Sequence, residues 1–462
     1  MFSLRNEEFG EIYLSVGIAV LTVNLWIAES IPIYLASLIP LLLIPLHGIL
    51  SFEKSISNYY NNTIRFFLGG FLLAYSIEKW HLHKRIAYKI LSYTGENPRG
   101  ILAGMMLSTC LISMWISNTA TAIMMLPVAI SVSSILNNSG SIHRNFFICM
   151  MLGIAYSANI GGIATITGTP PNIVYKGYLE TLHKLDISFF QWMIFGIPLS
   201  LIMLWITYHL LSGFLFKISK RPSQSVANLL DEQYEELGKI STPEKRTLII
   251  FTLTALLWIL NEPIQHLIQL INPSWTLKEH QIALGAGIIL LISPSGNRKG
   301  NRFSPLLVPK DLKSINWNIL ILFGGGMCMA KGLAVSGALE QLGILIKENS
   351  HFSIGLLLLI LIALALYSTE IMSNVALSQI FIPVVFGISE AFGMSNVHQF
   401  GLPVVFACSF AFMFPISTPP NAVVFSSGKV SMKDMAFAGF FINIVGILLL
   451  WAFGLYIVPH LF

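Results

Sequence analysis

Long apolar runs alternate with short polar connections along most of this 462-residue chain. A helix needs about 20 mostly apolar residues to cross the hydrocarbon core of a bilayer. The pattern therefore predicts a protein that spans a membrane many times rather than a soluble domain. The predicted spans are 12–28, 31–50, 64–80, 146–178, 191–216, 247–272, 281–293, 315–332, 398–428 and 435–459.

Two further apolar stretches, 100–136 and 353–392, are each interrupted near the middle by a small polar cluster. The clusters read ISNTAT at 116–121 and MSNVAL at 372–377. Irregular backbone at membrane depth is tolerated only inside protein or beside water. We therefore expect two re-entrant hairpins whose polar tips are buried at mid-membrane.

Three short motifs of the first half recur in the same order in the second half, which indicates a tandem duplication. The pairs are separated by 256, 256 and 249 positions: GGFLLA (69–74) with GGMCMA (325–330), SNTA (117–120) with SNVA (373–376), and TPPN (169–172) with TPPN (418–421). Each half holds five spans and one hairpin, so the second half enters the bilayer from the opposite side. The sequence thus predicts two inverted-topology repeats, a layout typical of secondary transporters.

The predicted division of the chain follows from this duplication. Residues 1–11 form an extracytoplasmic N-terminus, 12–216 the first inverted repeat, 217–246 a cytoplasmic linker and 247–459 the second inverted repeat. In this arrangement 19 of the 27 Lys and Arg residues lie on the cytoplasmic side, as the positive-inside rule requires. We expect a multi-pass protein of the plasma (inner) membrane with both termini extracytoplasmic.

Composition supports a lipid environment and excludes other classes. The chain is 55% hydrophobic and 11% charged, against roughly 25% charged residues in an ordinary soluble domain. This balance excludes a soluble globular protein, a disordered chain and a nucleic-acid binder. The four cysteines are scattered singly and the histidines form no HxxxH pair, so we expect neither a structural metal nor a disulfide framework.

The duplicated motifs place helix ends, and hence unpaired backbone groups, at mid-membrane. Each hairpin tip ends one helix and begins another. The prolines of the TPPN motifs likewise break the spans 146–178 and 398–428. Helix carboxyl ends favour a cation and amino ends favour an anion. The side chains expected around one midplane site are Ser117, Asn118, Thr119, Thr169, Asn374, Val375, Ser417 and Thr418.

These four motifs contain no Lys or Arg. A site of amides and helix dipoles can bind a carboxylate without trapping it, and sodium ions at the carbonyl ends would supply the missing positive charge. Anion and cation binding would then depend on each other, which is thermodynamic coupling. We also expect no cofactor other than sodium as a coupling ion.

The motifs resemble those of the divalent anion:sodium symporter family, which carries dicarboxylates, citrate or sulfate. The resemblance rests on SNTATAIMMLP (117–127) and GTPPN (168–172) in the first half, and on the TExxSNxA pattern (369–376) and STPPN (417–421) in the second. It implies an all-α polytopic protein with a scaffold and a transport domain, acting as a homodimer in the lipid bilayer.

The resemblance also implies roles for individual residues. One sodium ion would be bound by Ser113, Ser117, Asn118 and Gly168, and a second near Thr369, Met372, Asn374 and Ser417. The substrate would contact Asn118, Thr119, Thr169, Pro170, Asn374, Val375, Thr418 and Pro419. Val375 departs from the family pattern, which has Thr at this position, and one hydroxyl is therefore lost.

The expected function is import of a small dianion, a C4-dicarboxylate such as succinate, malate or fumarate, by sodium symport through elevator-type alternating access. An uncoupled dicarboxylate exchanger and a sodium:sulfate or sodium:citrate symporter are alternatives, and an anion channel is a further one. An intramembrane enzyme would need a nucleophile–base or metal constellation, and the sequence suggests none. For the intramembrane residue Glu370, a structural role in orienting the hairpin is favoured over a proton or cation role.

Overall fold

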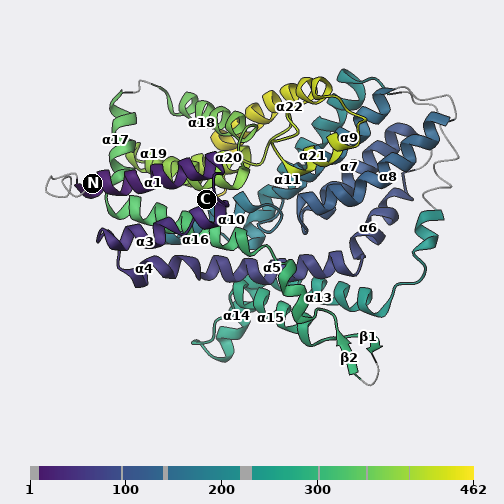
Figure 1. Cartoon of the computed structure of the whole chain (residues 1–462), viewed down its shortest axis with the longest axis horizontal. Helices are drawn as coiled ribbons and strands as arrows, with labels where there is room; N and C mark the ends of the chain where they lie inside the picture. Colours follow the sequence, from purple (N-terminus) through teal and green to yellow (C-terminus); the bar gives the residue numbers. More distant parts are fainter. Residues whose placement is uncertain are drawn as a thin grey trace.

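The computed structural model describes residues 10–94, 97–138, 144–218, 232–299, 302–349, 352–394 and 396–462. Most of the predicted N-terminal segment 1–11, and residues 219–231 of the predicted linker, lie outside these ranges. The described chain is almost entirely helical, with one short antiparallel strand pair, β1 (Pro294–Lys299) and β2 (Arg302–Pro305). The fold is an all-α polytopic membrane architecture (Figure 1).

The helices of the first half are α1 (Gly10–Ala28), α2 (Ile33–Ala36), α3 (Ile39–Leu46), α4 (Phe52–Ile56), α5 (Asn62–Lys79), α6 (Leu82–Leu91), α7 (Pro98–Ser113), α8 (Asn118–Asn138), α9 (Arg144–Gly162), α10 (Pro170–Tyr178) and α11 (Phe189–His209). Those of the second half are α13 (Thr242–Ile259), α14 (Asn261–Ile271), α15 (Glu279–Ile292), α16 (Trp317–Val335), α17 (Ala338–Asn349), α18 (Ile354–Thr369), α19 (Asn374–Ala391), α20 (His398–Ala407), α21 (Pro419–Ser426) and α22 (Met432–Ala452).

Six helices in the described ranges are long and apolar enough to cross a membrane unbroken, and α13 with α14 would make a seventh if counted as one bent span. These two helices meet at 77°, which differs from the single straight span expected over 247–272. Pro263 explains the bend, because it has no N–H to donate to the carbonyl of Ile259 one turn earlier.

The short helix after each break packs against helices of the opposite half. Helix α10, which follows the first break, packs against α19 and α20 of the second half. Helix α21, which follows the second break, packs against α8 and α9 of the first half. The two hairpins and the two broken helices therefore form one common core, in which almost every residue of α9 is buried.

The duplicated glycine pairs are close-packing positions. A Cβ atom at Gly69 of α5 would lie 2.6 Å from the Cβ of Ala283 on α15 and closer still to its backbone. At the equivalent position in the second half, a Cβ at Gly325 of α16 would collide with the backbone of Ser37. Both glycines thus allow a helix to approach a neighbouring backbone directly.

The amphipathic helix α6 and the β1–β2 pair lie at one end of the long axis, and α17 and α3 lie near the opposite end (Figure 1). The Arg85 guanidinium of α6 donates from Nε to Glu244 Oε1 at 2.5 Å and from one terminal nitrogen to Oε2 at 3.2 Å. Because Glu244 lies in the first turn of α13, this bidentate pair fixes α6 to that helix.

We expect Gly69→Ala to destabilise the protein, because the added methyl group would force α5 and α15 apart. Overpacking of this kind typically costs about 1–3 kcal/mol. The melting temperature in detergent should fall clearly. Gly285→Ala on α15 is the matched control, since nothing lies within 4 Å of its added Cβ. Equal melting temperatures for the two variants would contradict this account of the α5–α15 contact.

Candidate functional site

Three oxygen atoms converge where the first hairpin meets the first broken helix. Ser113 Oγ lies 2.7 Å from Asn118 Oδ1 and 2.8 Å from the carbonyl oxygen of Ala158. A hydroxyl has one proton and can donate it to only one acceptor at a time. The cluster therefore holds more lone pairs than protons, a donor set that suits a hard cation such as sodium.

The second half builds the same cluster from equivalent residues. Thr369 Oγ1 lies 2.7 Å from Asn374 Oδ1 and 2.8 Å from the carbonyl oxygen of Cys408. In each half the hydroxyl belongs to the last residue of a hairpin arm, α7 or α18. Both clusters thus lie at carboxyl ends of helices, where the backbone dipole favours positive charge.

The two asparagines also carry amide nitrogens that take no part in the oxygen clusters. Asn118 and Asn374 are the first residues of α8 and α19, so the free N–H groups of these helices lie at the tips. The described structure records no hydrogen-bond acceptor for the Nδ2 group of either amide, and both side chains are half-buried. In each half the amide oxygen therefore belongs to an oxygen cluster, and the Nδ2 group has no acceptor among the described residues.

Glycines bring the first tip and the first break together. A Cβ atom at Gly162 would lie 2.7 Å from Asn118 Oδ1 and 3.1 Å from the Cβ of Thr169, and one at Gly168 would collide with the carbonyl of Gly162. Asn118, Gly168 and Thr169 are thus neighbours. The other members of the first predicted set are Ser117, which is exposed, and Thr119 and Pro170, which are half-buried.

The last residue of each TPPN motif holds its break in shape. Asn172 Nδ2 donates to the carbonyls of Gly162 and Thr165 at 3.0 and 2.8 Å. Asn421 Nδ2 donates to the carbonyls of Ala411 and Phe414, both at 3.1 Å. These buried amides replace the N–H donors that an unbroken helix would supply.

Glu370 anchors the second tip to the second break. Its buried carboxylate accepts from the backbone N–H of Phe412 at 2.7 Å and of Met413 at 3.0 Å. It also accepts from Ser417 Oγ at 2.6 Å and from Asn443 Nδ2 at 2.7 Å. These contacts agree with a structural role for Glu370, and they engage the hydroxyl of Ser417, a predicted sodium ligand.

The remaining members of the second predicted set differ in their surroundings. Thr418 caps α21, where its Oγ1 accepts from the N–H of Asn421 at 3.4 Å. Met372 is half-buried and Pro419 is exposed. Val375 packs against an apolar cluster that includes Trp26 of α1. This cluster accounts for an apolar residue where the family pattern has Thr.

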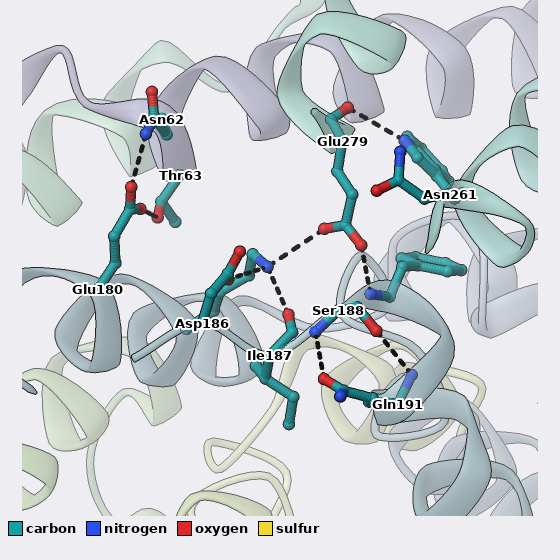
Figure 2. Close-up of polar contacts among 12 residues, drawn as sticks. Asn62, Thr63, Glu180, Asp186, Ile187, Ser188, Gln191, Asn261 and Glu279 are labelled. Carbon is teal, nitrogen blue, oxygen red and sulfur yellow. Dashed lines mark hydrogen bonds and ion pairs between the residues drawn. The ribbon is translucent and has the colours of Figure 1, made fainter. Parts of the chain in front are cut away.

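A separate polar cluster fixes the far end of α10 (Figure 2). The ammonium group of buried Lys176 lies 2.7 Å from Asp186 Oδ1 and 3.2 Å from Glu279 Oε2. Next to it, Glu180 accepts from Asn62 Nδ2 at 2.6 Å. Because a buried charge without a partner is costly, Lys176 keeps α10 close to the start of α15. A cavity of about 350 Å³ opens beside this cluster, and its lining includes none of the predicted site residues.

Sequence reasoning missed the groups that carry no side-chain signal. The carbonyls of Ala158 and Cys408 complete the oxygen clusters, yet any residue type could supply them. The amides of Asn159 and Asn443 were also missed, although a polar residue within an apolar span was a signal that could have found them.

The helical fold, its two broken helices and its paired oxygen clusters together define a polytopic membrane transporter. The chain belongs to the divalent anion:sodium symporter family, because the family described as "Sodium:sulfate symporter transmembrane region" matches residues 11–462.

Relatives of known name support this assignment. The chain is 35% identical over 462 residues to the "Sodium-dependent dicarboxylate transporter SdcS" of Staphylococcus saprophyticus. It is 36% identical over 457 residues to the protein of the same name from Staphylococcus aureus. Each match covers 96% of this chain and 86% of the relative.

Two solved structures share the fold at low identity. The Alcanivorax borkumensis YdaH transporter superposes with a TM-score of 0.58 at 12% identity, covering 97% of this chain and 98% of that one. The Neisseria gonorrhoeae protein MtrF gives a TM-score of 0.55 at 13% identity, covering 87% and 83%. At this identity the likeness concerns the fold alone.

We expect Gly162→Ala to reduce transport at least tenfold, because its methyl group would displace the Asn118 amide from the first cluster. A tenfold loss corresponds to about 1.4 kcal/mol. Uptake by reconstituted protein measures the effect. Gly213→Ala, whose added Cβ has open space around it, should transport normally. Normal uptake by Gly162→Ala would show that transport does not depend on the position of the Asn118 amide.

Asn118→Ala and Asn374→Ala should each abolish transport without preventing folding, since each removes an amide oxygen from an oxygen cluster and an N–H donor from a hairpin tip at once. Purified variants should remain monodisperse and show no uptake above empty liposomes. The control is Asn24→Ala, because the exposed Asn24 amide donates to the carbonyl of Val20 in its own helix and has no other partner in the described ranges. If either site variant kept wild-type uptake, the assignment of that amide would be wrong.

Proposed function

We propose that this protein imports a C4-dicarboxylate, such as succinate, malate or fumarate, together with sodium ions. The observation that carries the proposal is the double role of Asn118 and Asn374. Each amide oxygen belongs to an oxygen cluster, and each Nδ2 group is left to donate. Two such amides, one per half, match the two carboxylates of a dicarboxylate.

Sodium would make anion binding favourable. The described contacts of the two clusters include no Lys or Arg. A helix amino end stabilises a negative charge by at most about 2 kcal/mol in partly buried geometry. That is little against the cost of removing two charges from water. One sodium ion at each cluster would balance the dianion, and each ligand would then raise the affinity for the other.

The names of the relatives support this substrate class over the alternatives, because both are called sodium-dependent dicarboxylate transporters. Sulfate and citrate remain competing substrates, and an uncoupled exchanger would not need the oxygen clusters. We further propose that the two halves are inverted repeats, and that the core formed by the hairpins and broken helices moves against a scaffold in an elevator-type cycle. The protein would act as a homodimer in the plasma membrane, with both termini extracytoplasmic.

The test is uptake of radiolabelled succinate into proteoliposomes, in sodium buffer and in choline buffer at matched pH, with sulfate, citrate and 2-oxoglutarate as competitors. We expect uptake to need sodium and to rise sigmoidally with its concentration. Ser113→Ala and Thr369→Val should each shift that curve to higher sodium more than they lower uptake at saturating sodium.

The matched control is Ser134→Ala, because the exposed Ser134 hydroxyl donates to the carbonyl of Ile130 within α8 and makes no further hydrogen bond in the part of the chain that the structure describes. Uptake that is equal in sodium and choline would refute symport and favour an exchanger. Stronger competition by sulfate or citrate than by unlabelled succinate would reassign the substrate.

A further inference from the structure

One buried amide crosses from the first half of the core to the second. Asn159 of α9 is about 1% exposed. Its Nδ2 group donates to the carbonyl of Ala411 at 3.1 Å and to the hydroxyl of Thr418 at 3.1 Å. Both acceptors belong to the second broken helix, and Thr418 caps the helix that begins after the break. Asn159 therefore fixes the second break from a helix of the first half.

The residue before Asn159 belongs to the first oxygen cluster. The carbonyl of Ala158 accepts from Ser113 Oγ at 2.8 Å, beside Asn118 Oδ1. A cation bound at this cluster would hold the Ala158 carbonyl and, with it, this turn of α9. The next side chain along that turn holds Thr418. One turn of α9 thus supplies a carbonyl oxygen to the first cluster and a hydrogen-bond donor to the second break.

This link runs in one direction only. The position in the second half that matches Asn159, at the 250-residue offset relating Ala158 to Cys408, is Ser409. Its Oγ atom is buried and has no hydrogen-bond partner in the described structure. Among the described residues, the turn after α20 therefore makes no equivalent hydrogen bond to the first break, so the duplication alone does not explain Asn159.

We propose that Asn159 is a positioning residue that couples cation binding at the Ser113–Asn118 cluster to substrate binding at Thr418. This inference rests on the proposed function and adds a route for the coupling. Without the Asn159 donor, sodium at the first cluster would still bind, but it would no longer order the second break. Dicarboxylate affinity should then depend less on sodium.

The experiment measures succinate affinity of the purified protein at low and at saturating sodium, by calorimetry or by protection against thermal unfolding. The ratio of the two affinities reports the coupling. Asn159→Leu keeps the approximate size and removes the donor, and Asn159→Asp removes the N–H donors with little change of shape. We expect both variants to reduce the ratio by roughly fivefold or more, the lower end of typical coupling factors.

The matched control is Ser157→Ala on the same helix, because the buried Ser157 hydroxyl has no hydrogen-bond partner among the described residues. Its ratio should equal that of the wild type. A purely structural role for Asn159 would lower the melting temperature and leave the ratio unchanged, and that result would overturn the inference. If neither Asn159 variant folds, Thr418→Val deletes the same bond from its other end and Thr418→Ser retains it, so an equal ratio for these two would also overturn it.

The same measurement separates this inference from the proposed function. If succinate binding to the wild type does not depend on sodium, symport itself fails, whatever the variants do. If the wild type shows the dependence and a folded Asn159→Leu variant keeps it in full, symport stands and only the role of Asn159 is wrong.

Discussion

The structure depends on one constraint, which is that the backbone of a broken helix inside an apolar core must find hydrogen-bond partners. Lipid offers none, and an unpaired peptide group is costly to bury. Asn172 and Asn421 meet this constraint by donating to carbonyls of the unwound segments. Because these two amides stabilise the unwound segments, the segments need no regular helix to remain ordered inside the core. Their other carbonyl and N–H groups are then available for hydrogen bonds outside the backbone.

The two halves solve this problem with different chemistry around a shared geometry. The first break relies on close backbone contacts at Gly162 and Gly168. The second break is held by the carboxylate of Glu370, whose equivalent in the first half is Met114. A carboxyl group therefore lies one residue from Thr369 of the second oxygen cluster, where the first half has the Met114 side chain. The two clusters share the same oxygen–oxygen distances, but the side chains that surround them differ.

The sequence was informative where a residue type imposes a local outcome. Paired prolines cannot continue a helix but can begin one, and hydroxyl residues recur at matching places in the two hairpins as Ser113 and Thr369. Helices α10 and α21 accordingly begin at the first proline of each motif, whereas the preceding helices α9 and α20 end earlier, at Gly162 and Ala407. Carbonyl ligands such as that of Ala158 could not be predicted, because the backbone is the same at every position. The bend between α13 and α14 was not predicted, because a long apolar run outweighed the signal of Pro263.

The second group that could not be predicted consists of side chains whose hydrogen-bond or ion-pair partners are distant in the sequence. Lys176 reads as a charge near a span end, and only the fold brings it to Glu279. Asn159 likewise reads as one polar residue in an apolar helix, until the packing of α21 on α9 brings Thr418 to it. The exchange of helices between the halves creates this contact. The packing of a second-half helix on a first-half helix therefore brings the second break into contact with the helix that carries Ala158, a contact that neither half could make alone.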